Sequence, residues 1–204
     1  MAADALSAGI LAGGQSRRFG NDKAWTLIEG VPVIERLVAA LRAQSVDVLI
    51  SGRAPLARYA RLGCTVVDDQ LGAGPLAGVH SLLAMVRSDW LLVLPVDLVA
   101  IPGDWVVLWR ALLSEAPPGC RALILEDADG RWQPVHCLLH RSLRTAVAEA
   151  LLAKELGLGD FLRTVPARPI RLPAPASFNT RAELALACAQ SASAQSASAL
   201  SSCA

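Results

Sequence analysis

The sequence predicts a single α/β domain in which a mostly parallel β-sheet lies between two layers of helices. The chain has 204 residues, of which 53% are hydrophobic, enough for one domain with a large buried core. Short apolar runs of strand length alternate with longer stretches of helical periodicity, the order typical of βαβ units. Residues 90–94 are continuously apolar, as expected for a strand buried on both faces of a parallel sheet.

The first half of the chain begins with a strand at residues 7–12, an apolar run that ends at Gly13 and Gly14 and so indicates a following loop. Pro32 suits the first turn of a helix, and apolar residues then recur every three or four positions to residue 44. The elements predicted next are a strand at 46–50, a helical stretch at 55–61, a strand at 65–67 and a helix at 75–86.

The second half continues the same alternation. The predicted strands lie at 90–94, 122–125, 134–139 and 169–172, and the predicted helices at 105–113, 142–153, 160–165 and 180–189. Thr180 and Glu183 have the spacing of a capping box, which marks the start of the last helix. Residues 191–204 contain only Ala, Ser, Gln, Leu and Cys, so we expect a domain over residues 1–190 followed by a disordered tail.

The charge of the chain excludes several classes of function. Nineteen basic and eighteen acidic side chains give a net charge of +1, which argues against a protein that binds nucleic acid through bulk charge. No apolar run approaches the ~20 residues that cross a bilayer, and the N-terminus lacks the basic start of a secretory signal. We therefore expect a cytoplasmic protein without a membrane partner. His80, His136 and His140 do not have the spacing of zinc ligands.

The loop after the first strand, residues 11–23 with the sequence LAGGQSRRFGNDK, has the features of a phosphate site. Ligands in parallel sheets bind at the carboxyl ends of strands, where this loop begins. Gly13 and Gly14 allow the backbone to approach a ligand closely, and free backbone amides in such loops bind phosphate oxygens. Arg17, Arg18 and Lys23 add local positive charge. Neither the GxxxxGK[ST] nor the GxGxxG pattern is present, and an ordinary turn with solvated arginines is the alternative.

Asp97 follows the buried strand at residues 90–94, where an ionised carboxylate is costly unless it is paired or bound to a metal. We expect Asp97 to bind Mg²⁺, which takes few protein oxygens and completes its shell with substrate phosphates. The alternative is a cap for the helix near Trp105, although Asp104 is better placed for that. Asn179 is expected to contact the metal or a second substrate, or to cap the last helix.

Several motifs together resemble the molybdenum cofactor guanylyltransferase family. The loop at residues 11–23 is similar to the family signature LAGGxSxRxGxDK, and residues 74–78 match its GPLAG. Pro-Val-Asp at 95–97, followed by Ile-Pro at 101–102, resembles its aspartate segment, and residues 179–184 match its NTxxEL. The resemblance implies a Rossmann-like three-layer sandwich of the nucleotidyltransferase or glycosyltransferase-A type.

The resemblance also implies an activity and its site. A family member transfers GMP from GTP to the molybdenum-molybdopterin cofactor with Mg²⁺, releases pyrophosphate, and hands its product to molybdoenzyme chaperones or apo-enzymes. Such transfer needs no general base, because a phosphate nucleophile is already ionised, so catalysis rests on positioning and charge stabilisation. The implied catalytic residues are Lys23, Arg17 and Asp97, the last also the metal ligand. The implied nucleotide-binding residues are Leu11, Ala12, Gly13, Gly14, Lys23, Asp69, Gly78, Asp97 and Asn179.

Three other functions remain open at this point. A cytidylyltransferase of the same cofactor and a sugar-phosphate nucleotidyltransferase share the loop, although the pair Gly13 and Gly14 favours the guanine branch. A nucleotide-binding regulatory protein that has lost catalysis is the third, and the presence of both Lys23 and Asp97 argues against it.

Overall fold

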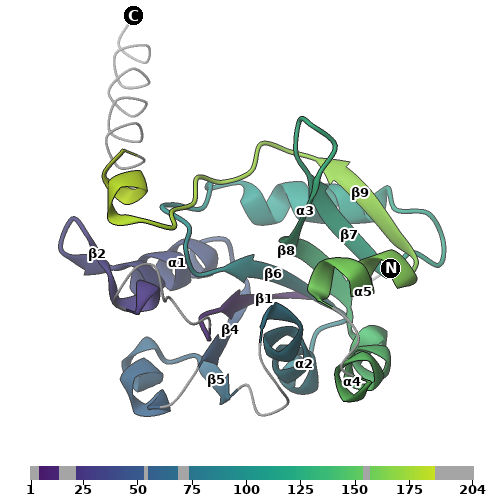
Figure 1. Ribbon diagram of the computed structural model, residues 1–204, viewed down its shortest axis with the longest axis horizontal. Coiled ribbons are helices and arrows are strands. Elements are labelled where there is room, and N and C mark those ends of the chain that lie inside the picture. The colour runs from purple at the N-terminus through teal and green to yellow at the C-terminus, as the bar shows by residue number, and fades with distance from the viewer. Residues whose placement is uncertain (1–4, 14–21, 53–54, 69–73, 154–156, 187–204) are drawn as a thin grey trace, which may run out of the picture.

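The computed structural model describes residues 5–13, 22–52, 55–68, 74–153 and 157–186, and it confirms the predicted fold class (Figure 1). A mostly parallel sheet runs through the middle of the molecule, with helices on both of its faces. Among the helices of these residues, none combines the length and the apolar character needed to span a bilayer.

Seven strands of the described chain form the large sheet, and one antiparallel strand, β8, lies among strands that run in a common direction. The strands are, in that order, β5 (Thr65–Asp68), β4 (Asp47–Gly52), β1 (Leu6–Leu11), β6 (Trp90–Pro95), β8 (Trp132–His140), β7 (Ala122–Glu126) and β9 (Ala167–Arg171). All neighbours pair in parallel except β8, which is antiparallel to both β6 and β7. The chain moves outward from β1 to β4 and β5 and then crosses back to β6, so the strand order reverses between β1 and β6.

The helices divide into two layers, each burying an apolar side against the sheet (Figure 1). Helices α1 (Val33–Arg42) and α3 (Trp105–Ser114) cover one face. Helices α2 (Pro75–Met85), α4 (Arg144–Leu152) and α5 (Leu158–Thr164) cover the other. The described residues also form three short 3-10 helices: η1 (Lys23–Trp25), η2 (Leu56–Leu62) and η3 (Arg141–Leu143).

Two glycines fix how α2 meets the sheet. A Cβ at Gly9 in β1 would lie 2.8 Å from Leu82 Cδ1 of α2, so the missing side chain lets the helix pack closely over the strand. Gly74 precedes the helix with a φ of +93°, a backbone conformation that L side chains rarely adopt. Pro75 then occupies the first turn, as predicted. Because α2 follows β5, it begins at the carboxyl edge of the sheet.

Several details of the structure differ from the sequence-based predictions. A hairpin of β2 (Leu27–Ile28) and β3 (Val31–Pro32) was not predicted, because two-residue strands are too short to show a period. The helical stretch predicted at 55–61 is confirmed, and it is the 3-10 helix η2. Residues 187–204 lie outside the described part of the chain, so the domain boundary and the disordered tail stay predictions.

The N-terminal cap of α3 comes from Gln44, which is distant in sequence, and not from Asp104. Asp104 precedes α3 but makes no side-chain cap bond. Gln44, just after α1, takes that role: its Oε1 accepts from Val106 N at 2.8 Å, and its Nε2 donates to Pro102 O at 2.9 Å. Capping by a residue distant in sequence leaves no local pattern.

Candidate active site

The candidate site lies at the carboxyl ends of β1 and β6, where the strand order reverses and where ligands bind in open α/β sheets. Backbone hydrogen bonds continue past the strands at this point. Ala12 N donates to Ser51 O at 2.7 Å, and Val96 N donates to Leu11 O at 3.2 Å. The start of the glycine loop and the segment that carries Asp97 are therefore fixed against each other by the sheet.

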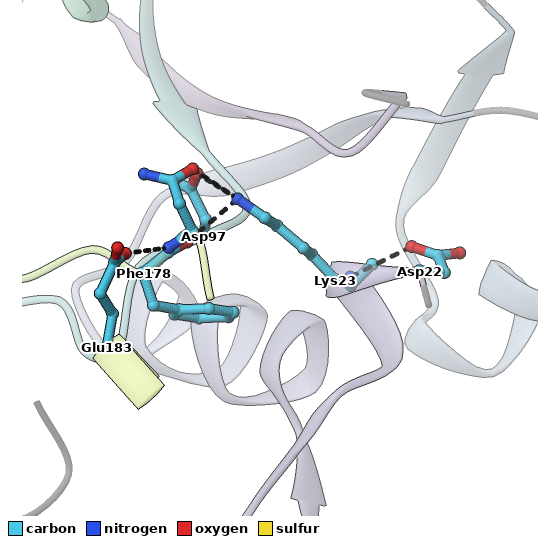
Figure 2. Close-up of polar contacts among 7 residues, drawn as sticks. Asp22, Lys23, Asp97, Phe178 and Glu183 are labelled. Atoms are coloured by element: carbon cyan, nitrogen blue, oxygen red, sulfur yellow. Dashed lines mark hydrogen bonds and ion pairs between the residues drawn. The ribbon is translucent and has the colours of Figure 1, made fainter. Parts of the chain in front are cut away.

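Lys23 is the centre of the polar contacts at this edge (Figure 2). Asp22 caps the short helix η1 by accepting from Ala24 N at 3.1 Å, which sets the position of the lysine. The Lys23 Nζ donates to Asp97 Oδ2 at 3.1 Å, to Phe178 O at 3.0 Å and to Asn179 Oδ1 at 2.8 Å. A lysine ammonium has three donors, and each has an acceptor here.

The ion pair between Lys23 and Asp97 is largely withdrawn from solvent. Their side chains are 13% and 24% exposed, so screening by water is weaker than at an open surface. The Phe178 ring is fully buried, and its centroid lies 5.7 Å from the ammonium, which adds a cation–π contact. The Asp97 carboxylate nevertheless remains partly exposed to solvent.

The chain after β9 returns to the site and is joined to the segment after β6. Phe178 N donates to Asp97 O at 2.9 Å, and Val99 N donates to Ala176 O at 2.9 Å, on either side of an antiparallel bridge between Leu98 and Ser177. Two segments that are far apart in the sequence are thereby held together, and Lys23 contacts both. The structure thus brings together three of the predicted site residues, Lys23, Asp97 and Asn179.

Asn179 belongs both to this cluster and to the start of the helical residues 181–186. Thr180 Oγ1 accepts from Glu183 N at 3.1 Å, so the predicted capping box is confirmed in its first half. The Glu183 carboxylate accepts from Asn179 N at 2.6 Å, one residue earlier than the usual partner in a capping box. The cap holds the Asn179 backbone, and the amide oxygen reaches Lys23.

The oxygen donors at the site fit a hard divalent cation. Asp97 Oδ2 and Asn179 Oδ1 accept from the same ammonium, so they lie next to each other, and the Asp97 side chain remains partly exposed. Carboxylate and amide oxygens are ligands suited to Mg²⁺, which completes its shell with water and phosphate. Within the described ranges, His, Cys, Asp and Glu side chains form no group of three suited to a metal.

His136 in β8 lies near Asp97, and the sequence analysis missed it. Its side chain is buried, and this burial lowers the pKa of the imidazole to about 4, while the Asp97 carboxylate acts in the opposite direction. The spacing of the three histidines argued against a zinc site and indicated no other role for them. A polar residue two positions after Pro134, at the start of an apolar strand, was the available signal, because proline interrupts strand pairing.

The remaining predicted residues divide into two groups. Leu11, Ala12 and Gly13 lie at the end of β1 beside the Val96 segment, and Gly78 is buried in the first turn of α2. Gly14, Arg17, Arg18 and Asp69 lie outside the described residues, so the structure neither supports nor opposes their predicted roles.

Comparison with known proteins identifies relatives of this chain. Residues 8–170 match the family model of the MobA-like NTP transferase domain. The chain is 32% identical over 173 residues to the molybdenum cofactor guanylyltransferase of Yersinia pseudotuberculosis, covering 83% of this chain and 86% of that protein. The Yersinia pestis protein of the same name is 31% identical over the same length, with the same coverage.

Solved structures share the fold at lower identity. Molybdopterin-guanine dinucleotide biosynthesis protein A of Archaeoglobus fulgidus superposes with a TM-score of 0.75 at 18% identity, covering 92% of this chain and 99% of that one. A 4-diphosphocytidyl-2C-methyl-D-erythritol synthase from Anaerococcus prevotii gives 0.68 at 10% identity, covering 92% and 98%. At these identities the two structures show the shared fold alone. With the family model spanning most of the chain, the protein belongs to the MobA-like NTP transferase family.

Proposed function

We propose that the protein transfers GMP from GTP to the molybdenum-molybdopterin cofactor, forming the guanine dinucleotide cofactor and releasing pyrophosphate. A phosphate oxygen of the acceptor attacks the α-phosphorus of GTP, a new P–O bond forms, and the bond to the β-phosphate oxygen breaks. The observation that carries the proposal is the cluster of Lys23, Asp97 and Asn179 at the strand-order reversal. It occurs in a chain that is 32% identical to a guanylyltransferase over most of its length.

The residues of this chain supply positioning and charge. Lys23, with Arg17 by resemblance, neutralises negative charge that develops on the α-phosphate and the leaving pyrophosphate. Because all three donors of Lys23 contact protein oxygens, a phosphate that binds Lys23 must replace at least one of them. The Phe178 carbonyl and Asn179 are the uncharged partners, so their loss costs less than loss of the Asp97 ion pair.

Mg²⁺ is the cation we assign to this site. Asp97 would hold it, with Asn179 as a neighbouring oxygen donor. When bound, the ion neutralises phosphate charge and favours departure of pyrophosphate. By resemblance, Leu11, Ala12, Gly13, Gly14, Asp69 and Gly78 bind the nucleotide, which places GTP over β1 and the start of α2.

The proposal extends to the partners and the place of the reaction. GTP and the pterin cofactor are its substrates, and molybdoenzyme chaperones or apo-enzymes receive the product. We place this reaction in the cytoplasm, where GTP is available.

Product analysis tests the function. The protein and Mg²⁺ are mixed with the molybdenum-molybdopterin cofactor and either GTP or CTP. In parallel reactions a sugar phosphate replaces the cofactor. Pyrophosphate and the nucleotide-containing products are then quantified. We expect equal amounts of pyrophosphate and guanine dinucleotide product with GTP. Product from CTP alone would assign the cytidylyl function instead, and nucleotide binding without any product would assign a regulatory protein.

A variant pair ties that activity to the cluster. Asp97→Asn keeps the shape of the side chain but removes its charge, whereas Asp104→Asn makes the same change at an exposed position without a cap bond. Loss of product with the first variant and retention with the second support the site. Equal activity in the two variants contradicts it.

A further inference from the structure

The antiparallel strand β8 contains a bulge at the same edge of the sheet as Asp97. β6 pairs with β8 up to Val93 and Cys137, which is the last pair of that register. On the other side of β8, Ile124 pairs with Cys137 but the next residue, Leu125, pairs with Gln133. Three residues, 134–136, therefore have no partner in either register. Because β8 runs opposite to β6, this bulge lies at the carboxyl end of β6, just before Asp97.

His136 is the polar side chain of this bulge, and its ring nitrogen has no partner. The residue is only 5% exposed, and within the described part of the chain Nδ1 is buried without a hydrogen-bond partner. An unmet polar atom in a buried place is costly, so such groups point to a ligand or to water. Bulges beside active sites commonly redirect a side chain, and Pro134 prevents this one from closing into regular pairing.

The His136 ring lies within electrostatic range of Asp97. Asp97 is the charged residue that acts on the His136 imidazole, in the direction that favours the protonated ring, but burial outweighs it. An imidazole has at least one N–H donor in either protonation state, so the ring can donate to an acceptor oxygen at the site.

The chemistry of the site favours a phosphate oxygen, rather than Mg²⁺, as the partner of the His136 ring. Mg²⁺ prefers oxygen ligands, so an imidazole is a poor ligand for it. Phosphate oxygens accept hydrogen bonds, and the reaction that we propose brings phosphates of both substrates to Asp97. β1 pairs with one side of β6 and β8 with the other, so β8 borders the carboxyl end of β6 on the side opposite β1.

We propose that His136 is a substrate-binding residue of the transfer site, donating a hydrogen bond from its imidazole to a substrate phosphate oxygen beside Asp97. This inference rests on the proposed function. The phosphate belongs either to the acceptor or to the nucleotide, and the two sources are separated by the test.

Three variants and one control form the test. His136→Phe removes the donor and keeps a ring, whereas His136→Asn and His136→Gln keep an N–H donor near one or the other ring nitrogen. His140→Gln is the matched control, because His140 lies in the same strand but its ring packs against Trp90 and contacts Ser142. For each protein we would measure kcat, the KM of GTP and of the pterin acceptor, GTP binding by calorimetry in Mg²⁺ without acceptor, and thermal unfolding.

A lost hydrogen bond to a charged phosphate weakens binding roughly tenfold or more. We expect His136→Phe to raise one KM by that factor, and at least one of the Asn and Gln variants to restore most of the loss. A raised acceptor KM with unchanged GTP binding identifies the acceptor phosphate, and weakened GTP binding in calorimetry identifies the nucleotide. Wild-type values for His136→Phe, or equal losses in all three variants together with lowered thermal stability, would overturn the inference. Absence of product with the wild-type protein would refute the proposed function instead.

Discussion

At the carboxyl edge of the sheet, the two sides of β6 differ in whether their polar groups have partners. On the β1 side, every charged group of the cluster has a partner: Lys23 donates to three oxygens, and Asp97 pairs with its ammonium. On the β8 side, the ladder is interrupted, and a buried ring nitrogen of His136 is left without a described partner. On the parallel half of this edge, the β1 side, the charged groups hold one another in place, whereas the antiparallel half, the β8 side, has a buried hydrogen-bonding group without a described partner.

Removing the negative charge of Asp97, on the parallel half, should have the largest effect on turnover. Asp97→Asn leaves Lys23 without its ion pair and removes the anionic ligand for Mg²⁺. We expect turnover to fall about 1000-fold, equivalent to about 4 kcal/mol of transition-state stabilisation. Pyrophosphate release measures it, with Asp104→Asn as the control. A fall of less than tenfold would place the cation elsewhere.

The amine of the same pair is the next target. Lys23→Ala removes the cation that faces the phosphates and all three of its contacts to protein oxygens. We expect a loss of about 3 kcal/mol of transition-state stabilisation, or about 100-fold in turnover. The same assay at saturating GTP and Mg²⁺ checks this, and normal turnover would refute a catalytic Lys23.

On the antiparallel half, the burial of His136 should make the free energy of unfolding depend on pH. The pKa of His136 falls from an ordinary 6.5 to about 4 in the folded chain, so the unfolded chain takes up the proton first as the pH drops. The contribution of the uncharged His136 to the free energy of unfolding is therefore fully present above pH 6.5 and is lost as the pH falls toward 4. Between pH 7 and pH 5 this loss amounts to about 2 kcal/mol. Urea unfolding in the presence of a chelator measures the difference.

His136→Phe supplies the reference for that measurement. Groups other than His136 titrate in both proteins, so the variant should lose about 2 kcal/mol less than the wild type between the two pH values. His140→Gln should behave like the wild type, since its ring contacts lie at the other end of β8. An identical pH dependence in the wild type and His136→Phe would show that the ring is not buried in its uncharged form.

The smallest effect belongs to a position away from both halves. Gln44→Ala removes the cap of α3 and the bond to Pro102. We expect a loss of about 1 kcal/mol in the free energy of unfolding and unchanged turnover, because capping stabilises the helix without touching the cluster. Denaturant unfolding and the pyrophosphate assay check the two parts. A large fall in turnover would show that the α3 layer positions the site.

Sequence patterns predicted the parallel half well because its signals are local. The strand at residues 7–12 and the apolar run at 90–94 were confirmed as β1 and β6, within one residue at either end. Lys23 and Asp97 follow those strands in motifs, and the carboxyl-edge rule brought them to the same place. The contact of Lys23 with the Phe178 carbonyl could not be predicted, because backbone atoms carry no sequence signal.

The antiparallel half was predicted only in part for a physical reason. Hydrophobic periodicity locates a strand such as β8 but not its direction, and direction decides which end reaches the active edge. The bulge depends on which residues of β7 and β8 pair, a long-range property. The cap by Gln44 and the two-residue strands of the β2–β3 hairpin escaped for the same reason, since each is stabilised by contacts distant in sequence or by a turn too short to show a period.

A crystal structure with Mg²⁺ and a non-hydrolysable GTP analogue tests the central claim most directly. Our account predicts the triphosphate within hydrogen-bond distance of the Lys23 amine, the cation on the Asp97 carboxylate, and the guanosine over the end of β1. A triphosphate bound away from Lys23, or a cation that leaves Asp97 free, would contradict it.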